Sequence, residues 1–158
     1  MKLNIGGGLQ PIEGFLNVDL CEGADIKHDL RNPLPFEDNS VDEIMAVHAI
    51  EHFYQWELPA ILKDWARVLN GKLTIEFTEL NATIYLYLNG NEEESQRGHW
   101  GLYGDQSKPI DPILVHRYVY EKSELYNLLA NTGFKNIKFT KEGINHVPAR
   151  DWRVTCST

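Results

Sequence analysis

The first fifty residues contain short apolar runs that are bounded by glycine, proline or polar residues. The runs at residues 2–5 (KLNI) and 15–20 (FLNVDL) predict buried strands, and residues 25–30 (DIKHDL) predict a third. Residues 42–50 (DEIMAVHAI) are apolar almost without interruption, as is typical of a strand that is covered on both faces. The pattern therefore predicts four strands before the first helix.

The apolar period changes to that of a helix after these strands. The positions with helical spacing are Leu58, Ile61, Leu62, Trp65 and Leu69. Pro59 fits the first turn, and Asn70-Gly71 is expected to end the helix. Residues 72–77 (KLTIEF) predict the next strand, whereas residues 80–89 (LNATIYLYLN) fit either a helix or an extended segment.

Residues 90–118 form a polar segment that is rich in glycine and aromatic residues and includes Pro109 and Pro112. A loop of this length inside a compact domain is usually functional or mobile. Polar and aromatic groups on such a segment suit a lid that closes over a substrate. We therefore expect residues 90–118 to be a substrate-lid loop.

The end of the chain completes the pattern with one helix and two strands. Ser123 is expected to cap the helix, which ends at Gly133. Residues 136–142 and 151–157 predict the strands. Strands that alternate with helices predict an α/β fold with a mostly parallel sheet, and the strand–strand ending allows one antiparallel member.

The composition suits a single domain over residues 1–158, since 42% of the residues are apolar. The net charge of -8 argues against nucleic acid as a partner, because proteins that neutralise phosphates usually show a basic patch. The sequence has no long apolar run and no signal-peptide pattern, so we expect a cytoplasmic protein without a membrane partner. Cys21 and Cys156 lack the spacing of a zinc site, so reduced thiols are expected and no metal site is predicted.

Three glycines, Gly6 to Gly8, follow the first predicted strand, and Asp19 lies at the end of the second. In open α/β sheets, ligands bind outside the carboxyl ends of the strands. Glycine lets a ligand approach the backbone closely, and a carboxylate at Asp19 can accept two hydrogen bonds from ribose hydroxyls. These residues favour a nucleoside ligand, although three glycines can also form a simple tight turn.

The standard dinucleotide fingerprint does not fit this segment. GGGLQP lacks the third glycine of GxGxxG, and Pro11 and Gly14 interrupt any helix that could follow. Without a helix N-terminus, a pyrophosphate loses its usual binding site. A ligand that carries ribose but no pyrophosphate is the better fit.

Six stretches, in the right order, resemble the class I S-adenosylmethionine-dependent methyltransferases, in particular a small branch whose glycine motif runs into an NVDL strand. They are LNIGGG, GFLNVDL, ADIKHDLRNPLPFEDNSVDEI, AVHAIEHF, ARVLNGKLTIEF and ELYNLLANTGF. The resemblance implies a Rossmann-like fold with a mostly parallel seven-stranded sheet whose last strand is antiparallel. The chain lacks the N-terminal helices of larger relatives, so its site is expected to be open or closed by a partner chain.

The resemblance also implies S-adenosylmethionine as methyl donor and S-adenosylhomocysteine as product. The glycines would lie against the methionine part, Asp19 would bind the ribose and Asp29 would take the adenine amine. His48 would line the cofactor at the end of the fourth strand. The cofactor-binding residues predicted in this way are Asn4, Gly6, Gly7, Gly8, Asp19, Leu20, Asp29, Leu30 and His48.

Methyl transfer requires an aligned acceptor and can require a base that removes a proton from it. Glu51 and His52 follow the fourth predicted strand, beside the expected cofactor. Relatives of this branch carry a similar stretch around His116 that would face the acceptor. Glu51, His52 and His116 are therefore the predicted catalytic residues.

The acceptor is expected to be a small hydroxylated or carboxylated molecule, such as a sugar or a cell-envelope precursor. An NPPY motif would suggest methylation of a nucleobase or glutamine amine, but VHAIEH stands in its place. Trp56, Trp65, Tyr85 and Tyr87 are expected to lie in the core rather than to stack on bases.

Two other functions remain open from the sequence. The chain could be a non-catalytic S-adenosylmethionine-binding module or the partner subunit of another methyltransferase. It could also be a different nucleoside-using enzyme, such as a dehydrogenase or an aminopropyltransferase, because the fold alone does not set the function. Separately, a homo-oligomer or a complex with a partner chain is compatible with the sequence.

Overall fold

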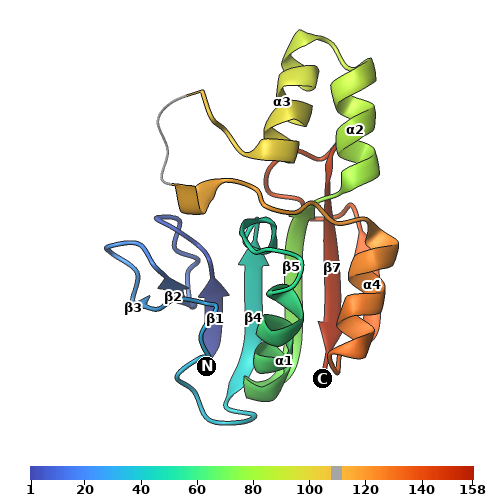
Figure 1. Ribbon diagram of the computed structural model, residues 1–158. Helices are drawn as coiled ribbons and strands as arrows, with labels where there is room; N and C mark the ends of the chain where they lie inside the picture. Colours follow the sequence, from blue (N-terminus) through green and yellow to red (C-terminus); the bar gives the residue numbers. More distant parts are fainter. Residues whose placement is uncertain (108–111) are drawn as a thin grey trace.

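The computed structural model describes residues 1–107 and 112–158. These residues form a seven-stranded sheet with the strand order β3-β2-β1-β4-β5-β7-β6 (Figure 1). Strands β1 to β5 pair in parallel, and β7 is antiparallel to both of its neighbours. The predicted fold, with its antiparallel last strand, is confirmed.

The first four strands follow one another without an α-helix between them, and the α-helices lie between β4 and β6 in the sequence. The strands are β1 (Lys2–Ile5), β2 (Leu16–Asp19), β3 (Ile26–Lys27), β4 (Val41–Val47), β5 (Leu69–Thr78), β6 (Lys135–Thr140) and β7 (Asp151–Ser157). The α-helices are α1 (Leu58–Val68), α2 (Leu80–Asn89), α3 (Glu92–Tyr103) and α4 (Lys122–Asn131), with 3-10 turns η1 (Ile50–His52) and η2 (Pro112–Leu114). Among the described residues, none of these helices is long and apolar enough to cross a bilayer.

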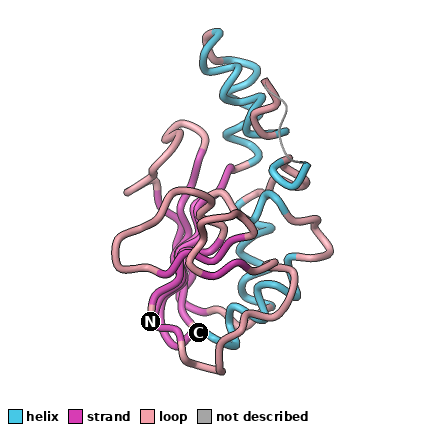
Figure 2. Tube along the Cα trace, turned by 90° about the vertical axis from the view of Figure 1, so that its left-hand side faces the viewer, coloured by secondary structure: helices cyan, strands magenta, loops and turns pink. Residues whose placement is uncertain are grey.

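The two faces of the sheet differ in what covers them. Helices α1 and α4 lie on one face, and loops lie on the other (Figure 2). Side chains alternate between the faces of a strand, so Leu3, Ile44 and Ile75 join the core under the helices. Their neighbours Asn4 and Met45 face the other way. This second face is polar near the chain ends, where Lys2 and Lys72 each place Nζ 2.9 Å from the Glu43 carboxylate.

The segment predicted as a long loop, residues 90–118, contains helix α3, so this prediction is wrong in its first half. Asn91 caps the helix: its side chain accepts from Glu94 N, and the Glu94 carboxylate accepts from Asn91 N. Gly98 allows α3 to pack closely on α2, because a Cβ there would lie 2.6 Å from Tyr87 N. Residues 108–111, including Pro109, lie outside the described residues. A lid role for this segment stays a prediction.

The undecided segment, residues 80–89, is helix α2, and the two helices form a hairpin above the sheet (Figure 1). Three of the four aromatic residues expected in the core are exposed. Trp65 is fully buried, but Trp56 is 73% exposed and Tyr85 is 69% exposed, and Tyr87 also faces solvent. Helical spacing alone does not say which face is buried when the neighbouring element is a second polar helix.

Three predicted boundaries also differ from the structure. Strand β4 ends at Val47 because His48 turns the chain with a φ of 49°. Asn70-Gly71 does not end helix α1 but lies inside β5, where a Cβ on Gly71 would meet Asp42 O at 2.2 Å. Ser123 lies inside the first turn of α4 rather than at its cap, since the helix starts at Lys122.

Candidate functional site

A cavity of about 930 Å³ opens at the carboxyl ends of β1, β2 and β4 and extends over the face of the sheet that carries no helix. Its lining includes the glycine loop and Asp19 at one end. At the other end it includes His48, Asn145, His146 and Arg153. We call the first part the glycine end and the second the charged end.

The glycine loop at the first end needs its glycines for two physical reasons. Gly6 and Gly8 have φ values of 68° and 54°, a left-handed conformation that other residues rarely adopt. A Cβ on Gly6 would lie 2.6 Å from Ala49 Cβ, and one on Gly7 would lie 2.1 Å from Asn4 Nδ2. Nothing lies within 4 Å of the Cβ position of Gly8, so a ligand can reach the backbone there.

Asp19 holds this loop in place and still faces the cavity. Its Oδ2 accepts from Gly8 N at 2.9 Å, and its Oδ1 accepts from Cys21 N at 2.9 Å. A carboxylate oxygen can accept more than one hydrogen bond, so each keeps capacity for a ligand hydroxyl. The arrangement suits the two hydroxyls of a ribose.

Asn4 is buried beneath the loop and also reaches the cavity. Its Nδ2 donates to Gln10 O at 3.1 Å and to Asn17 Oδ1 at 3.2 Å. Its Oδ1 is buried and has no hydrogen-bond partner among the described residues. An unsatisfied buried acceptor is costly, so this atom fits a ligand donor such as an ammonium group.

Asp29, predicted to take the adenine amine, is already paired in the structure. The Arg31 guanidinium binds the Asp29 carboxylate with Nε at 2.9 Å from Oδ1 and Nη2 at 2.8 Å from Oδ2. This hydrogen bonding holds the Asp29 pKa below its usual range. Leu20 and Leu30 line the same part of the cavity. The predicted adenine contact stays a prediction, and Arg31 joins the site as a residue that the sequence analysis missed.

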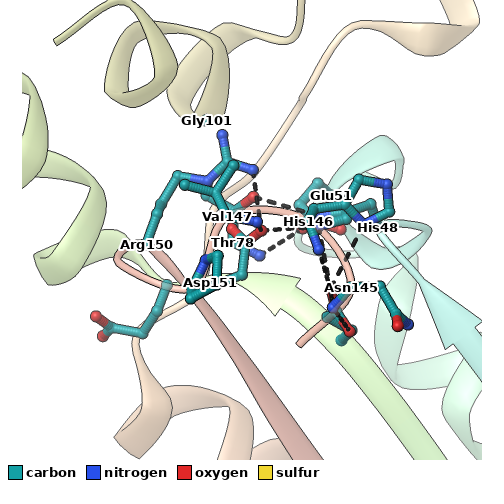
Figure 3. Close-up of polar contacts among 12 residues, drawn as sticks. His48, Glu51, Thr78, Gly101, Asn145, His146, Val147, Arg150 and Asp151 are labelled. Carbon is teal, nitrogen blue, oxygen red and sulfur yellow. Dashed lines mark hydrogen bonds and ion pairs between the residues drawn. The ribbon is translucent and has the colours of Figure 1, made fainter. Parts of the chain in front are cut away.

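The charged end is built around His48, whose ring lies between two buried carboxylates (Figure 3). Its Nδ1 is 3.0 Å from Glu51 Oε1, and its Nε2 is 3.1 Å from Asp151 Oδ2. Burial opposes the charged ring, but the hydrogen bonds to Asp151 and Glu51 outweigh it and raise the His48 pKa to about 10. His48 is therefore an imidazolium at neutral pH, with both nitrogens donating.

Further hydrogen bonds also hold the same two carboxylates. Asp151 Oδ1 accepts from Arg150 Nε at 2.6 Å, and Glu51 Oε1 accepts from Thr78 N at 2.7 Å. Burial raises the pKa of Glu51, but the hydrogen bond from His48 more than offsets it and leaves the Glu51 pKa far below its usual range. Both carboxylates therefore remain ionised inside the protein.

A third buried carboxylate, Glu76 on β5, anchors the loop between β6 and β7. Its oxygens accept from Asn145 N at 2.9 and 3.0 Å and from His146 N at 3.2 Å. Arg153 Nη2 lies 3.2 Å from Glu76 Oε2. Among the described residues, three carboxylates thus face three cations in this network: Glu51, Glu76 and Asp151 against His48, Arg150 and Arg153.

Comparison with known proteins shows similarity to methyltransferases in sequence and in fold. Residues 16–74 match the family model for a methyltransferase domain. An S-adenosylmethionine-dependent methyltransferase from Archaeoglobus fulgidus superposes with a TM-score of 0.65 over 99% of this chain and 85% of that one, at 18% identity. Residues 16–74 thus resemble the methyltransferase-domain family in sequence, and the fold is that of the class I S-adenosylmethionine-dependent methyltransferases. S-adenosylmethionine is the cosubstrate of this family.

Two further solved structures are similar to this chain. A possible histamine N-methyltransferase from Thermotoga maritima has a TM-score of 0.62 and 17% identity, covering 99% of this chain and 81% of that one. A Haloferax volcanii methyltransferase in complex with the Trm112 activator has a TM-score of 0.60 and 13% identity, with 99% and 81% covered. At these identities the structural likeness shows the fold alone. No curated protein matches the sequence.

The three predicted catalytic residues have different positions relative to the cavity. His52 lines the cavity, and its Nδ1 lies 3.4 Å from Val115 O. Burial lowers the His52 pKa. Glu51 is fully buried against His48, and His116 places Nδ1 2.8 Å from Gly101 O. Neither Glu51 nor His116 belongs to the cavity lining of the described residues. Catalytic roles for these three residues stay predictions.

The sequence analysis missed several residues of the charged end. They are Glu76, Asn145, His146, Arg150, Asp151 and Arg153. Most lie in or next to a loop near the end of the chain, which carries no recognisable motif. A usable signal was present in KLTIEF, where a glutamate lies in an otherwise buried strand, because a buried carboxylate needs partners.

Three atoms at the charged end, from His48, Glu76 and His146, lie within 4.8 Å of one another, as the ligands of a metal ion can. The donor set fits a metal poorly, because both nitrogens of His48 are used by carboxylates and Glu76 is already neutralised by Arg153. The expectation of no metal site stays a prediction.

Proposed function

We propose that this methyltransferase transfers a methyl group to a small-molecule acceptor that binds at the charged end of the cavity. One observation carries the proposal: a single cavity joins the glycine end to the charged end. The methyl donor and the acceptor can therefore come into direct contact with no part of the protein between them, as direct displacement requires. The acceptor class is a small hydroxylated or carboxylated molecule, for which a sugar or a cell-envelope precursor is a candidate.

The residues of the glycine end fit S-adenosylmethionine. Asp19 would take the ribose hydroxyls, Gly6 to Gly8 would give backbone access, and the unpaired Asn4 Oδ1 would accept from the methionine ammonium. When bound, the cosubstrate supplies a methyl group on a positively charged sulfur. The protein's own part is to orient both molecules and to exclude water from the reacting atoms.

Calorimetric titration of the purified chain tests the cosubstrate part of this proposal. S-adenosylmethionine and S-adenosylhomocysteine should bind the wild type, and NAD should not. Asp19→Ala should weaken both by about a hundredfold, since hydrogen bonds to a charged group contribute about 1.5–3 kcal/mol each. Asp38→Ala, at an exposed ion pair with Arg67, serves as the matched control and should bind normally. Tight NAD binding would instead favour a dehydrogenase.

A second candidate function is that of a methyltransferase subunit that needs a partner chain. One solved relative was captured with an activator protein. The described residues also leave one face of the sheet without a helix, next to the cavity (Figure 2). Methyl transfer by the lone chain would rule this candidate out, whereas activity that appears only after addition of a partner would support it.

A further inference from the structure

The loop between β6 and β7, residues 141–150, forms part of the wall of the charged end. Asn145 and His146 from this loop line the cavity. Buried Glu76 fixes their position by accepting hydrogen bonds from both of their backbone N–H groups. The loop is therefore held in place by charge rather than by apolar packing.

Four histidines lie at or near this end of the cavity, and three are poorly suited to accept a proton. His48 already donates from both nitrogens. His52 is largely buried. Burial lowers its pKa, and the neighbouring His116 and Arg117 lower it further. His116 is bound to Gly101 O and lies outside the lining formed by the described residues.

His146 differs from these three in exposure and in partner. Its side chain is 41% exposed, and Nδ1 lies 3.5 Å from Glu76 Oε1. Among the described residues, its ring makes no hydrogen bond within normal geometry, so Nε2 has capacity for a ligand. A carboxylate at Nδ1 favours the tautomer in which Nδ1 carries the proton and Nε2 accepts one. Such contacts are often long before substrate binds.

We propose that the β6–β7 loop forms the acceptor subsite, in which His146 Nε2 takes the proton from a hydroxyl or amino acceptor while Glu76 orients the ring. This inference rests on the proposed function and names the acceptor chemistry: a neutral group that carries a dissociable proton. Glu76 acts as a positioning residue, since it reaches the acceptor only through His146.

The step balances without a further reactant. A lone pair on the acceptor oxygen or nitrogen forms a bond to the methyl carbon. The bond from that carbon to sulfur breaks, and its electron pair stays on sulfur, which becomes the neutral thioether of S-adenosylhomocysteine. The acceptor proton moves to His146 Nε2, and solvent later removes it through the exposed side of the ring.

The test compares acceptors that carry a proton with acceptors that do not. Unsubstituted phenol, aniline and a sugar alcohol, which are all neutral at pH 7, represent the first group. Pentafluorophenol, an anion at neutral pH, represents the second. S-adenosylhomocysteine release is measured for wild type, His146→Gln, His52→Gln and His99→Gln. His99 is a matched control, since it lies on α3 outside the cavity lining of the described residues.

The proposal predicts that His146→Gln loses about 10²–10⁴-fold in kcat/KM with the proton-carrying acceptors. It predicts less than a threefold loss with pentafluorophenol, and an unchanged S-adenosylhomocysteine Kd by calorimetry. In His146→Ala, free imidazole should restore part of the activity. Glu76→Gln, which can still accept from the loop amides, should lower kcat while leaving the KM for S-adenosylmethionine unchanged.

Three results would overturn the proposal. The first is an equal loss with both groups of acceptors. The second is a loss in His52→Gln but not in His146→Gln. The third is an absence of turnover with every acceptor although S-adenosylhomocysteine binds. The proposed cosubstrate site would then stand, but the proposed acceptor subsite would be wrong. Failure to bind S-adenosylhomocysteine would overturn the proposed function itself, so the two failures can be told apart.

Discussion

The two ends of the cavity are built by different means. The glycine end comes from one continuous stretch, residues 4–30, in which backbone conformation and a single carboxylate shape the surface. The charged end gathers residues from three segments that are far apart in the sequence: His48 with Glu51 after β4, Glu76 on β5 and Asp151 at the start of β7. Local shape therefore supports one end, whereas buried ion pairs support the other, and the two ends should respond differently to mutation and to pH.

The largest expected effect is loss of stability when the charged end loses one carboxylate. Asp151→Ala leaves the His48 imidazolium and Arg150 without their shared partner inside the protein. Breaking a buried ion pair costs about 3–5 kcal/mol of unfolding free energy. Urea denaturation measures this loss. Asp38→Ala, at an exposed pair, should cost less than about 1 kcal/mol. Similar values for the two variants would show that the buried network contributes little.

A second effect is a dependence of stability on alkaline pH. The His48 pKa is raised from 6.5 to about 10 in the folded protein. A raised pKa means that the charged ring stabilises the fold fully below pH 6.5 and that this contribution is lost as the pH rises toward 10. The unfolding free energy of the wild type should fall over that range. His48→Gln should be less stable at pH 6 but should show a flatter profile. Parallel profiles would contradict the assignment of a charged His48.

A smaller effect is expected at the glycine end. Gly7→Ala places a methyl group 2.1 Å from Asn4 Nδ2 and 2.4 Å from Asn17 Oδ1, so the loop must shift. We expect about a tenfold weaker S-adenosylhomocysteine affinity by calorimetry, with a change in unfolding free energy below about 3 kcal/mol. The methyl group of Gly8→Ala would contact no neighbouring atom. Any loss of affinity should therefore come only from the left-handed backbone conformation at this position. A larger loss in Gly8→Ala than in Gly7→Ala would contradict this account of the loop.

The sequence predicted the glycine end far better than the charged end, and the reason is physical. Gly6 to Gly8 and Asp19 act through backbone conformation and local hydrogen bonds, which a short stretch specifies. The role of His146 depends on Glu76, which is seventy positions away in the chain. Only the folded sheet brings such pairs together, and no spacing rule marks them.

The sequence also predicted some elements of the fold and missed others. The succession of the strands along the chain followed from the apolar runs, and the antiparallel β7, which the family resemblance implied, is confirmed. Helix α3 was missed because its polar surface gives little apolar periodicity, although the Asn91–Glu94 capping box was present in the sequence. Gly98 and Gly101 suggested a loop, whereas they serve close packing against Tyr87 and Thr83.

Calorimetric titration of S-adenosylhomocysteine into two isosteric variants tests the division of the cavity most directly. Asp19→Asn changes the glycine end, and His146→Gln changes the charged end. The account predicts that Asp19→Asn weakens binding at least tenfold, while His146→Gln keeps the wild-type affinity within about threefold. Equal losses in both variants, or a loss only in His146→Gln, would contradict the placement of the cosubstrate at the glycine end.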